Sequence, residues 1–159
     1  MDHPLTHLDT AGHARMVDVT DKQPTIRSAT AAGRVVTSAE TVSLLRDGSV
    51  PKGDVLAVAR IAAIQAAKKT PELLPLAHVI GVHGAVVDLA ITDDGVDITA
   101  TVRTADRTGV EMEALTSVSV AALAVVDMVK GRDRSAHITD IRLLTKTGGR
   151  SGTWMREGA

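Results

Sequence analysis

TGVEMEALTSVSVAALAVVDMVK, residues 108–130, is the stretch around which the rest of the chain can be interpreted. It opens with Glu111 and Glu113, closes with Asp127 and Lys130, and carries no charge between Glu113 and Asp127. Ala and Ser fill most positions between larger apolar residues that recur at roughly helical spacing: Met112, Leu115, Val118, Leu123, Val126 and Val129. The stretch predicts a core helix against which another helix or a sheet can pack closely.

The two ends of this helix hold the clearest candidates for acid–base chemistry. Thr108 and Glu111 fit a capping box, which, together with the helix dipole, explains Glu111 without any function. Glu113 lies on a nearly opposite side and is not explained by that box. Asp127 and Lys130 are three residues apart and share a helix face. A surface ion pair and a pair that transfers protons or binds phosphate are both open.

The separation of the two ends limits what they can do together. Glu113 and Asp127 are fourteen positions apart, which is on the order of 21 Å along one straight helix. They cannot serve one small active site within a single copy. Either they do unrelated jobs, or antiparallel copies from two subunits bring opposite ends together, which makes an interfacial site in an oligomer a hypothesis.

Two further helices are expected before this one. Thr37-Ser-Ala-Glu40 reads as a capping box, and Gly48 supplies the C-terminal stop of a short helix. Asp54 is a good N-cap for a helix over residues 55–69, which Thr70-Pro71 should end because Pro disfavours a helical residue before it. The side of that helix expected to be apolar carries Val55, Val58, Ala62 and Ala66.

Strands are expected around these helices, at residues 34–37, 82–91, 96–102 and 138–144. Asp94-Gly95 gives a hairpin turn signal between the second and the third. The third alternates between apolar residues (Val96, Ile98, Ala100 and Val102) and polar ones, so one of its faces should be buried. Strands and helices interleaved around an antiparallel hairpin indicate the α+β class.

Composition bounds the function. A length of 159 residues suits one domain. We expect a flexible arm over residues 1–19, a single domain over 20–152 with a mobile loop at 147–152, and a tail over 153–159. A net charge of −1 argues against a general nucleic-acid binder. The absence of Cys excludes disulfides and thiolate chemistry. No apolar signal region or membrane span is evident, so a cytoplasmic protein without a membrane partner is expected.

Several other side chains each have a functional and a plain interpretation. Lys52 precedes a helix N-terminus that can favour an anion, and Lys146 and Arg150 flank glycines that form either a phosphate grip or a flexible loop. His78 lies in an apolar setting, where a lone His is usually a core residue. His3, His7 and His13 are irregularly spaced and are interpreted as solvated. We propose no metal site and no cofactor from the sequence.

Taken together, these segments resemble the MoaC (molybdenum cofactor biosynthesis protein C) family of cyclic pyranopterin monophosphate synthases. The resemblance covers most of the chain, and its most specific run is Gly-Val-Glu-Met-Glu-Ala-Leu at residues 109–115. It also includes Met-Val-Asp-Val at 16–19, Lys-Gly-Asp-Val at 52–55, Pro-Leu-Ala-His at 75–78, Asp-Met-Val-Lys at 127–130 and Arg-Leu-Leu-Thr-Lys-Thr-Gly-Gly-Arg-Ser-Gly at 142–152.

The resemblance implies a ferredoxin-like antiparallel sheet packed against helices, in a hexamer of three dimers with active sites at dimer interfaces. It implies that a cyclised dihydro-GTP is rearranged into cyclic pyranopterin monophosphate, with release of pyrophosphate. By motif, the catalytic positions fall on Asp127, Lys52 and Lys130. The substrate-binding positions fall on His78, Glu111, Met112, Glu113 and Lys146.

Two positions depart from the family pattern. Ala77 and Val79 stand where the family commonly has Cys and Pro on either side of the histidine. Loss of the Pro could reposition His78, and about 1 Å of misplacement can matter roughly a hundredfold. The alternative hypothesis is therefore a catalytically impaired paralogue, which binds a guanine nucleotide or pterin or assembles with an active homologue.

Overall fold

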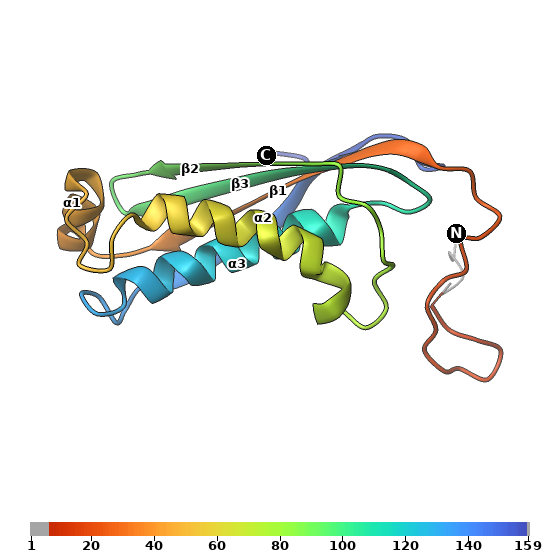
Figure 1. The fold of residues 1–159 in the computed structure, drawn as a ribbon, viewed down its shortest axis with the longest axis horizontal. Helices are drawn as coiled ribbons and strands as arrows, with labels where there is room; N and C mark the ends of the chain where they lie inside the picture. Colours follow the sequence, from red (N-terminus) through yellow and green to blue (C-terminus); the bar gives the residue numbers. More distant parts are fainter. Residues whose placement is uncertain (1–6, 159) are drawn as a thin grey trace.

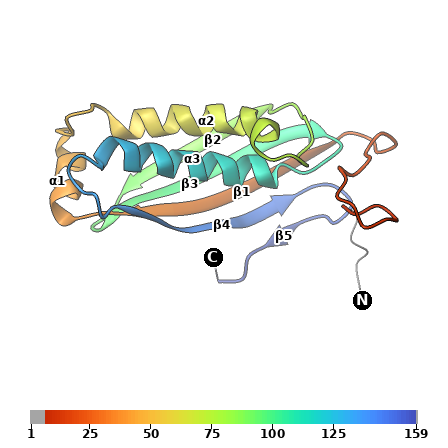
Figure 2. The same cartoon turned by 90° about the horizontal axis from the view of Figure 1, so that it is seen from below.

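The computed structural model describes residues 7–158, and it has one antiparallel sheet with two long helices side by side over one face (Figures 1 and 2). Its elements are β1 (Thr25–Val36), α1 (Ala39–Asp47), α2 (Val55–Leu73), β2 (Gly84–Ile91), β3 (Gly95–Asp106), α3 (Glu111–Val129), β4 (His137–Thr147) and β5 (Trp154–Met155). This arrangement confirms the α+β class.

The sheet has the strand order β2-β3-β1-β4-β5, with β1 antiparallel to both β3 and β4. The first four strands follow the ferredoxin-like order, as the resemblance implied. The apolar side of β3 is buried as predicted, with Val96 and Ile98 at most 1% exposed. The hairpin turn is also confirmed, since Thr92 N donates to Gly95 O at 2.9 Å. A side chain at Gly95 would overlap the Val35 carbonyl, so only glycine fits this turn.

α3 packs against β1 and α2, as expected for a core helix, and it buries the predicted Val118 and Val129, but two of the predicted residues are exposed. Met112 and Leu123 are 43% and 58% exposed. The buried positions of α3 carry mainly small residues: Glu113, Ala114, Ser117, Val118, Ala121, Ala122, Val125 and Val129. The reason is close approach, because Gly33 of β1 lies directly under Val118 and Ser117 Oγ donates to Ala63 O of α2 at 2.9 Å. Bulky side chains fit only on the outward side.

α2 continues four residues beyond the predicted end, to Leu73, with Pro71 inside it. The prediction was wrong because the hydrogen bond that Pro71 cannot make is replaced. The carbonyl of Ala67, which would accept from residue 71, instead accepts from Thr70 Oγ1 at 3.1 Å. The predicted buried side is only partly right, since Val55 and Ala66 are buried but Val58 is exposed. The residues that α2 buries are Val55, Ala59, Ala63, Ala66, Ala67 and Thr70.

The predicted helix caps are only partly right. Gly48 ends α1 in the left-handed conformation, with φ 66°, and Asp54 accepts from Ala57 N, both as predicted. The N-cap of α1 is Ser38, whereas Thr37 donates its hydroxyl to Asp133. The capping box at Thr108 does not form. α3 starts after Val110, with no side chain bonded to its first turn.

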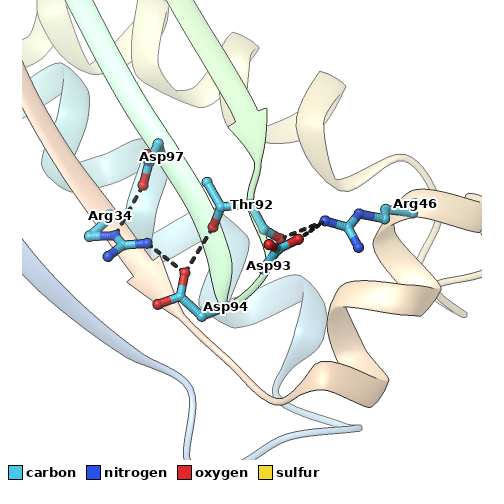
Figure 3. A network of polar contacts seen from close by, with 6 residues as sticks. All are labelled: Arg34, Arg46, Thr92, Asp93, Asp94 and Asp97. Carbon is cyan, nitrogen blue, oxygen red and sulfur yellow. Dashed lines mark hydrogen bonds and ion pairs between the residues drawn. The ribbon is translucent and has the colours of Figure 1, made fainter.

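The β2–β3 turn is bound to its surroundings by arginines (Figure 3). Arg34 of β1 contacts Asp97 at 3.0 Å and Asp94 at 2.7 Å, and Thr92 also donates to Asp94. Arg46 of α1 contacts Asp93 at 2.7 Å. These exposed pairs each add little stability. Arg46 joins α1 to the hairpin and Arg34 joins β1 to it, at the end of the molecule opposite the N-terminal arm (Figure 1).

Both chain ends have more regular structure than the sequence indicated. Leu8 and Ala14 form an isolated bridge in the arm, and β5 pairs with the end of β4. Residues 1–6, which include the predicted solvated His3, lie outside the described residues. In the segment predicted as a loop, Gly148, Gly149 and Gly152 adopt φ of 87°, 73° and 63°, which other residues rarely adopt.

α3 is also long and apolar enough to cross a membrane by length and composition alone, with a mean hydropathy of 1.7. Half of that window is buried inside the protein. The core helix of a soluble protein meets the same criterion, and the packing of α3 on the sheet and on α2 accounts for its composition.

Candidate functional site

Three of the predicted residues meet at the C-terminal end of α3, and we name them the lysine–aspartate cluster: Lys52, Asp127 and Lys130. Lys130 Nζ lies 2.8 Å from Asp127 Oδ1, and Lys52 Nζ lies 3.3 Å from Asp127 Oδ2. The hydrogen bonds from Lys130 and then Lys52 hold the pKa of Asp127 below its usual range. All three side chains are about half exposed, so the cluster lies at the surface of the protein.

The local backbone explains how these groups converge. Lys130 is the C-cap of α3 and follows Asp127 by one turn. Lys52 comes from the connection between α1 and α2, where Gly53 turns the chain with φ 105°. Lys52 Nζ also donates to the backbone carbonyl of Asp127 at 2.8 Å. A cation at this position is favoured because the last carbonyls of a helix have no partner within the helix.

Asp133, which the sequence reasoning missed, holds the loop after the cluster. It is 8% exposed, and its Oδ2 accepts from Thr37 Oγ1 at 2.7 Å and Ser38 N at 2.8 Å. Its Oδ1 accepts from the N–H and the hydroxyl of Ser135. These bonds, Ser135 first, hold the pKa of Asp133 far below its usual range. The start of α1 is thereby fixed to the end of α3.

A second group of predicted residues lines a cavity of about 560 Å³ at the opposite, N-terminal end of α3, which we name the His78 cavity. It is lined by the predicted His78, Glu111, Met112 and Glu113, together with His7, Val17, Val19, Lys22, Leu76, Ala77, Thr108, Gly109 and Leu143. Of the two departures from the family pattern, Ala77 lines the cavity, whereas Val79 is 88% exposed.

The two glutamates of this cavity differ in environment. Glu113 is 3% exposed, and burial raises its pKa to about 7, with Glu111 adding to the rise and His78 opposing it. A carboxyl group with that pKa can donate or accept a proton near neutral pH. The Glu111 carboxylate folds back over Gly109, where any side chain would overlap it. Glu111 therefore lines the cavity and does not cap α3.

Lys146, the last predicted residue, lies at the same end of the protein on β4. Its ammonium donates to Ser151 Oγ. Ser151 lines a neighbouring cavity of about 630 Å³ that also includes Lys22, Arg27 and Arg150. Since Lys22 lines both cavities, the His78 cavity has a basic neighbour suited to phosphate groups.

One copy of the chain thus separates the predicted site residues into two groups. The lysine–aspartate cluster lies at the C-terminal end of α3, and the His78 cavity, with Lys146 nearby, lies at the N-terminal end. Sequence reasoning missed Lys22, Asp133 and the arm residues of the cavity, because their side chains match no catalytic spacing. Within residues 7–158, no three His, Asp or Glu side chains gather to hold a metal ion.

Comparison with known proteins gives a consistent result. The model of the MoaC family matches residues 16–149. A cyclic pyranopterin monophosphate synthase from Streptomyces coelicolor is 62% identical over 152 residues, which is 96% of this chain and 89% of that protein. Synthases from a Nocardioides species and from Chloroflexus aurantiacus are 62% and 56% identical, over 96% of this chain and 95% and 94% of theirs.

Proposed function

This chain belongs to the MoaC family, and on that basis we propose that it is a cyclic pyranopterin monophosphate synthase of molybdenum cofactor biosynthesis. Its substrate is cyclised dihydro-GTP, and its products are cyclic pyranopterin monophosphate and pyrophosphate. It is a lyase that acts on phosphorus–oxygen bonds. The observation that carries this proposal is the arrangement of acid–base groups at both ends of α3, in a chain about 60% identical to named synthases.

The reaction needs the types of residue that the two groups contain. Water must open the purine ring and a pterin ring must close, which requires proton donors and acceptors of different pKa. We assign Lys52 and Lys130 as acid–base residues, with Asp127 tuning both, because Asp127 contacts both ammonium groups. The triphosphate must be held while pyrophosphate leaves, which calls for cations.

At the other end, we assign His78, Glu111, Met112 and Glu113 to the purine–pterin ring, because they line one cavity. Lys146 is assigned to phosphate, beside the basic cavity that contains Arg27 and Arg150. The chemistry described for these groups uses protons and charge alone, and no cofactor or metal is part of the proposal.

Because the two groups lie at opposite ends of one helix, we propose that each active site combines the lysine–aspartate cluster of one subunit with the His78 cavity of another. The assembly is a hexamer, a trimer of dimers with sites at dimer interfaces. Support comes from large apolar side chains exposed on the outward sides of α2 and α3: Val58, Ile61, Leu73, Met112 and Leu123. Exposed apolar surface of this kind is typical of subunit contacts.

We further propose a cytoplasmic location and a catalytic domain over residues 20–152, flanked by the arm over 1–19 and the tail over 153–159. The arm is not passive in this proposal, because Val17 and Val19 line the His78 cavity.

The direct experiment supplies enzymatically prepared cyclised dihydro-GTP and measures pyrophosphate and pterin product. We expect stoichiometric formation of both by the wild-type protein. If the wild-type protein gave no product and the Ala77→Cys/Val79→Pro variant did, the chain would instead be an impaired paralogue. If neither the wild-type protein nor this variant acted on the substrate, the proposed reaction would be wrong.

A further inference from the structure

The N-terminal arm has a defined structure over residues 7–15. Arg15 N donates to His7 O at 2.8 Å, and Asp9 N donates to His13 O at 2.9 Å, which closes a small hairpin. The Asp9 carboxylate accepts from the backbone N–H groups of Ala11 and His13 and stabilises the turn. The hairpin therefore forms from its own polar groups rather than from a hydrophobic core.

Beyond the hairpin, the arm runs along the His78 cavity. His7, Val17, Val19 and Lys22 all line that cavity, and Arg107 Nε donates to the Lys22 carbonyl at 2.8 Å. The family match begins only at residue 16, so His7 lines the cavity from outside the matched segment. The arm is one wall of this cavity.

The closest polar contact between the arm and the cavity is made by a backbone carbonyl. Val17 O lies 2.5 Å from His78 Nε2. A carbonyl oxygen can only accept a hydrogen bond, so the proton must be on Nε2. Within residues 7–158 the imidazole makes no second hydrogen bond. In the neutral ring, Nδ1 is then unprotonated and able to accept.

We propose that the Val17 carbonyl is a positioning group, which fixes the proton of His78 on Nε2 and presents Nδ1 to the ligand as a hydrogen-bond acceptor. The other titratable groups that line the cavity are His7, Lys22, Glu111 and Glu113. An unprotonated Nδ1 of His78 can accept a hydrogen bond from the N–H or amino group of a heterocyclic ligand. That the heterocycle is guanine-derived rests on the proposed function, whereas the tautomer does not.

Two substitutions of His78 distinguish the role of Nε2 from that of Nδ1, and the test does not require an activity assay. A Gln side chain places its amide nitrogen near the position of Nε2, whereas the shorter Asn reaches only the position of Nδ1. The amides of Thr20 and Lys22, which donate to Asp18 Oδ1 and to the Val19 carbonyl, lie in the segment next to Val17. In the full-length protein, their hydrogen–deuterium exchange should match the wild type in His78→Gln. In His78→Asn, which loses the bond to Val17, it should be about tenfold faster. Equal exchange in the two variants would overturn the proposal.

A spectroscopic measurement on the unaltered protein closes the test. In protein labelled with ¹⁵N in its histidine rings and ¹³C in its valine carbonyls, solid-state NMR should show His78 with a protonated Nε2 close to a valine carbonyl. The His78→Gln variant assigns the signal. A proton on Nδ1, or the absence of a close valine carbonyl, would contradict the proposal. Neither experiment uses the substrate. The positioning role of the Val17 carbonyl can therefore be refuted while the proposed reaction is upheld, and the proposed reaction can be refuted while the positioning role is upheld.

Discussion

Asp127 lies between two ammonium groups that reach it from different segments, and removing either one should leave a site unable to move protons. We expect Lys52→Ala and Lys130→Ala to lower kcat at least about a hundredfold in an assay of pyrophosphate release, since a positioned acid or base contributes that much. Lys68→Ala, an exposed lysine on α2, is the matched control and should leave kcat unchanged. Near-normal turnover in either cluster variant would refute its catalytic role.

Glu113 should make stability depend on pH. Its pKa is about 7 in the folded protein and 4.5 as an ordinary Glu, so between these values the folded state keeps a proton that the unfolded state releases. Wild-type stability should therefore fall as pH rises through this window. Glu113→Gln removes this pH dependence. The free energy of unfolding of the variant, relative to that of the wild type, should therefore increase by about 2 kcal/mol from pH 5 to pH 8. Thermal unfolding at both pH values tests this, with Glu72→Gln as control; a gain independent of pH would contradict it.

Asp133 should matter for stability more than any exposed carboxylate. An Asn in its place keeps one acceptor oxygen, so the donors from either Thr37 and Ser38 or Ser135 lose their partner. We expect Asp133→Asn to destabilise by at least about 2 kcal/mol, as measured by denaturant unfolding. Asp140→Asn is the control, because the Asp140 side chain is exposed and should change stability by less than about 0.5 kcal/mol. Equal effects would show that the buried hydrogen bonds add nothing.

At the scale of elements, the C-terminal end of α2 depends on one hydroxyl. Thr70 Oγ1 bonds to the carbonyls of Ala66 and Ala67 and compensates for Pro71. Thr70→Val keeps the shape but removes both bonds, and it should cost about 1–2 kcal/mol, because the Ala67 carbonyl is left without a partner. Hydrogen exchange of the last turn of α2 should rise together with that loss. Unchanged exchange there would mean that packing alone carries the helix past the proline.

The same element shows what the sequence can predict. Alternation in β3 and the Asp94-Gly95 turn signal were enough to predict the hairpin, because residue types there act locally. Apolar spacing predicted the buried sides of α2 and α3 only in part, because it grouped the exposed Val58 and Leu123 with the buried Val55 and Val118. Gly33 and the alanines of α2 let the chains approach so closely that Val58 and Leu123 are excluded from the contact. Size, rather than hydrophobicity, decides which side is buried.

The candidate site divides in the same way. The residues carried over by motif do gather in two groups, as the spacing of Glu113 and Asp127 required. The groups that hold them could not be predicted, since the Asp133 carboxylate and the Val17 carbonyl act through contacts between segments that are distant in sequence. A backbone carbonyl, moreover, has no sequence signature.

At the scale of the whole molecule, the central claim is that two subunits share each active site. Each subunit has a lysine–aspartate cluster at one end of α3 and a His78 cavity at the other. If sites form between subunits, a variant damaged only in the cluster and a variant damaged only in the cavity can each supply the half that the other lacks. If each active site were formed within one subunit, mixing the two variants would not restore activity.

The most direct measurement mixes Lys52→Ala and His78→Ala subunits after partial unfolding and refolding, and assays pyrophosphate release from cyclised dihydro-GTP. Each variant alone should be nearly inactive. In the refolded mixture, half of the dimers combine the two variants, and one of their two sites is intact, so activity should return to about a quarter of the wild-type value. Activity that stays at the level of the separate variants, in oligomers shown to contain both, would contradict the shared site.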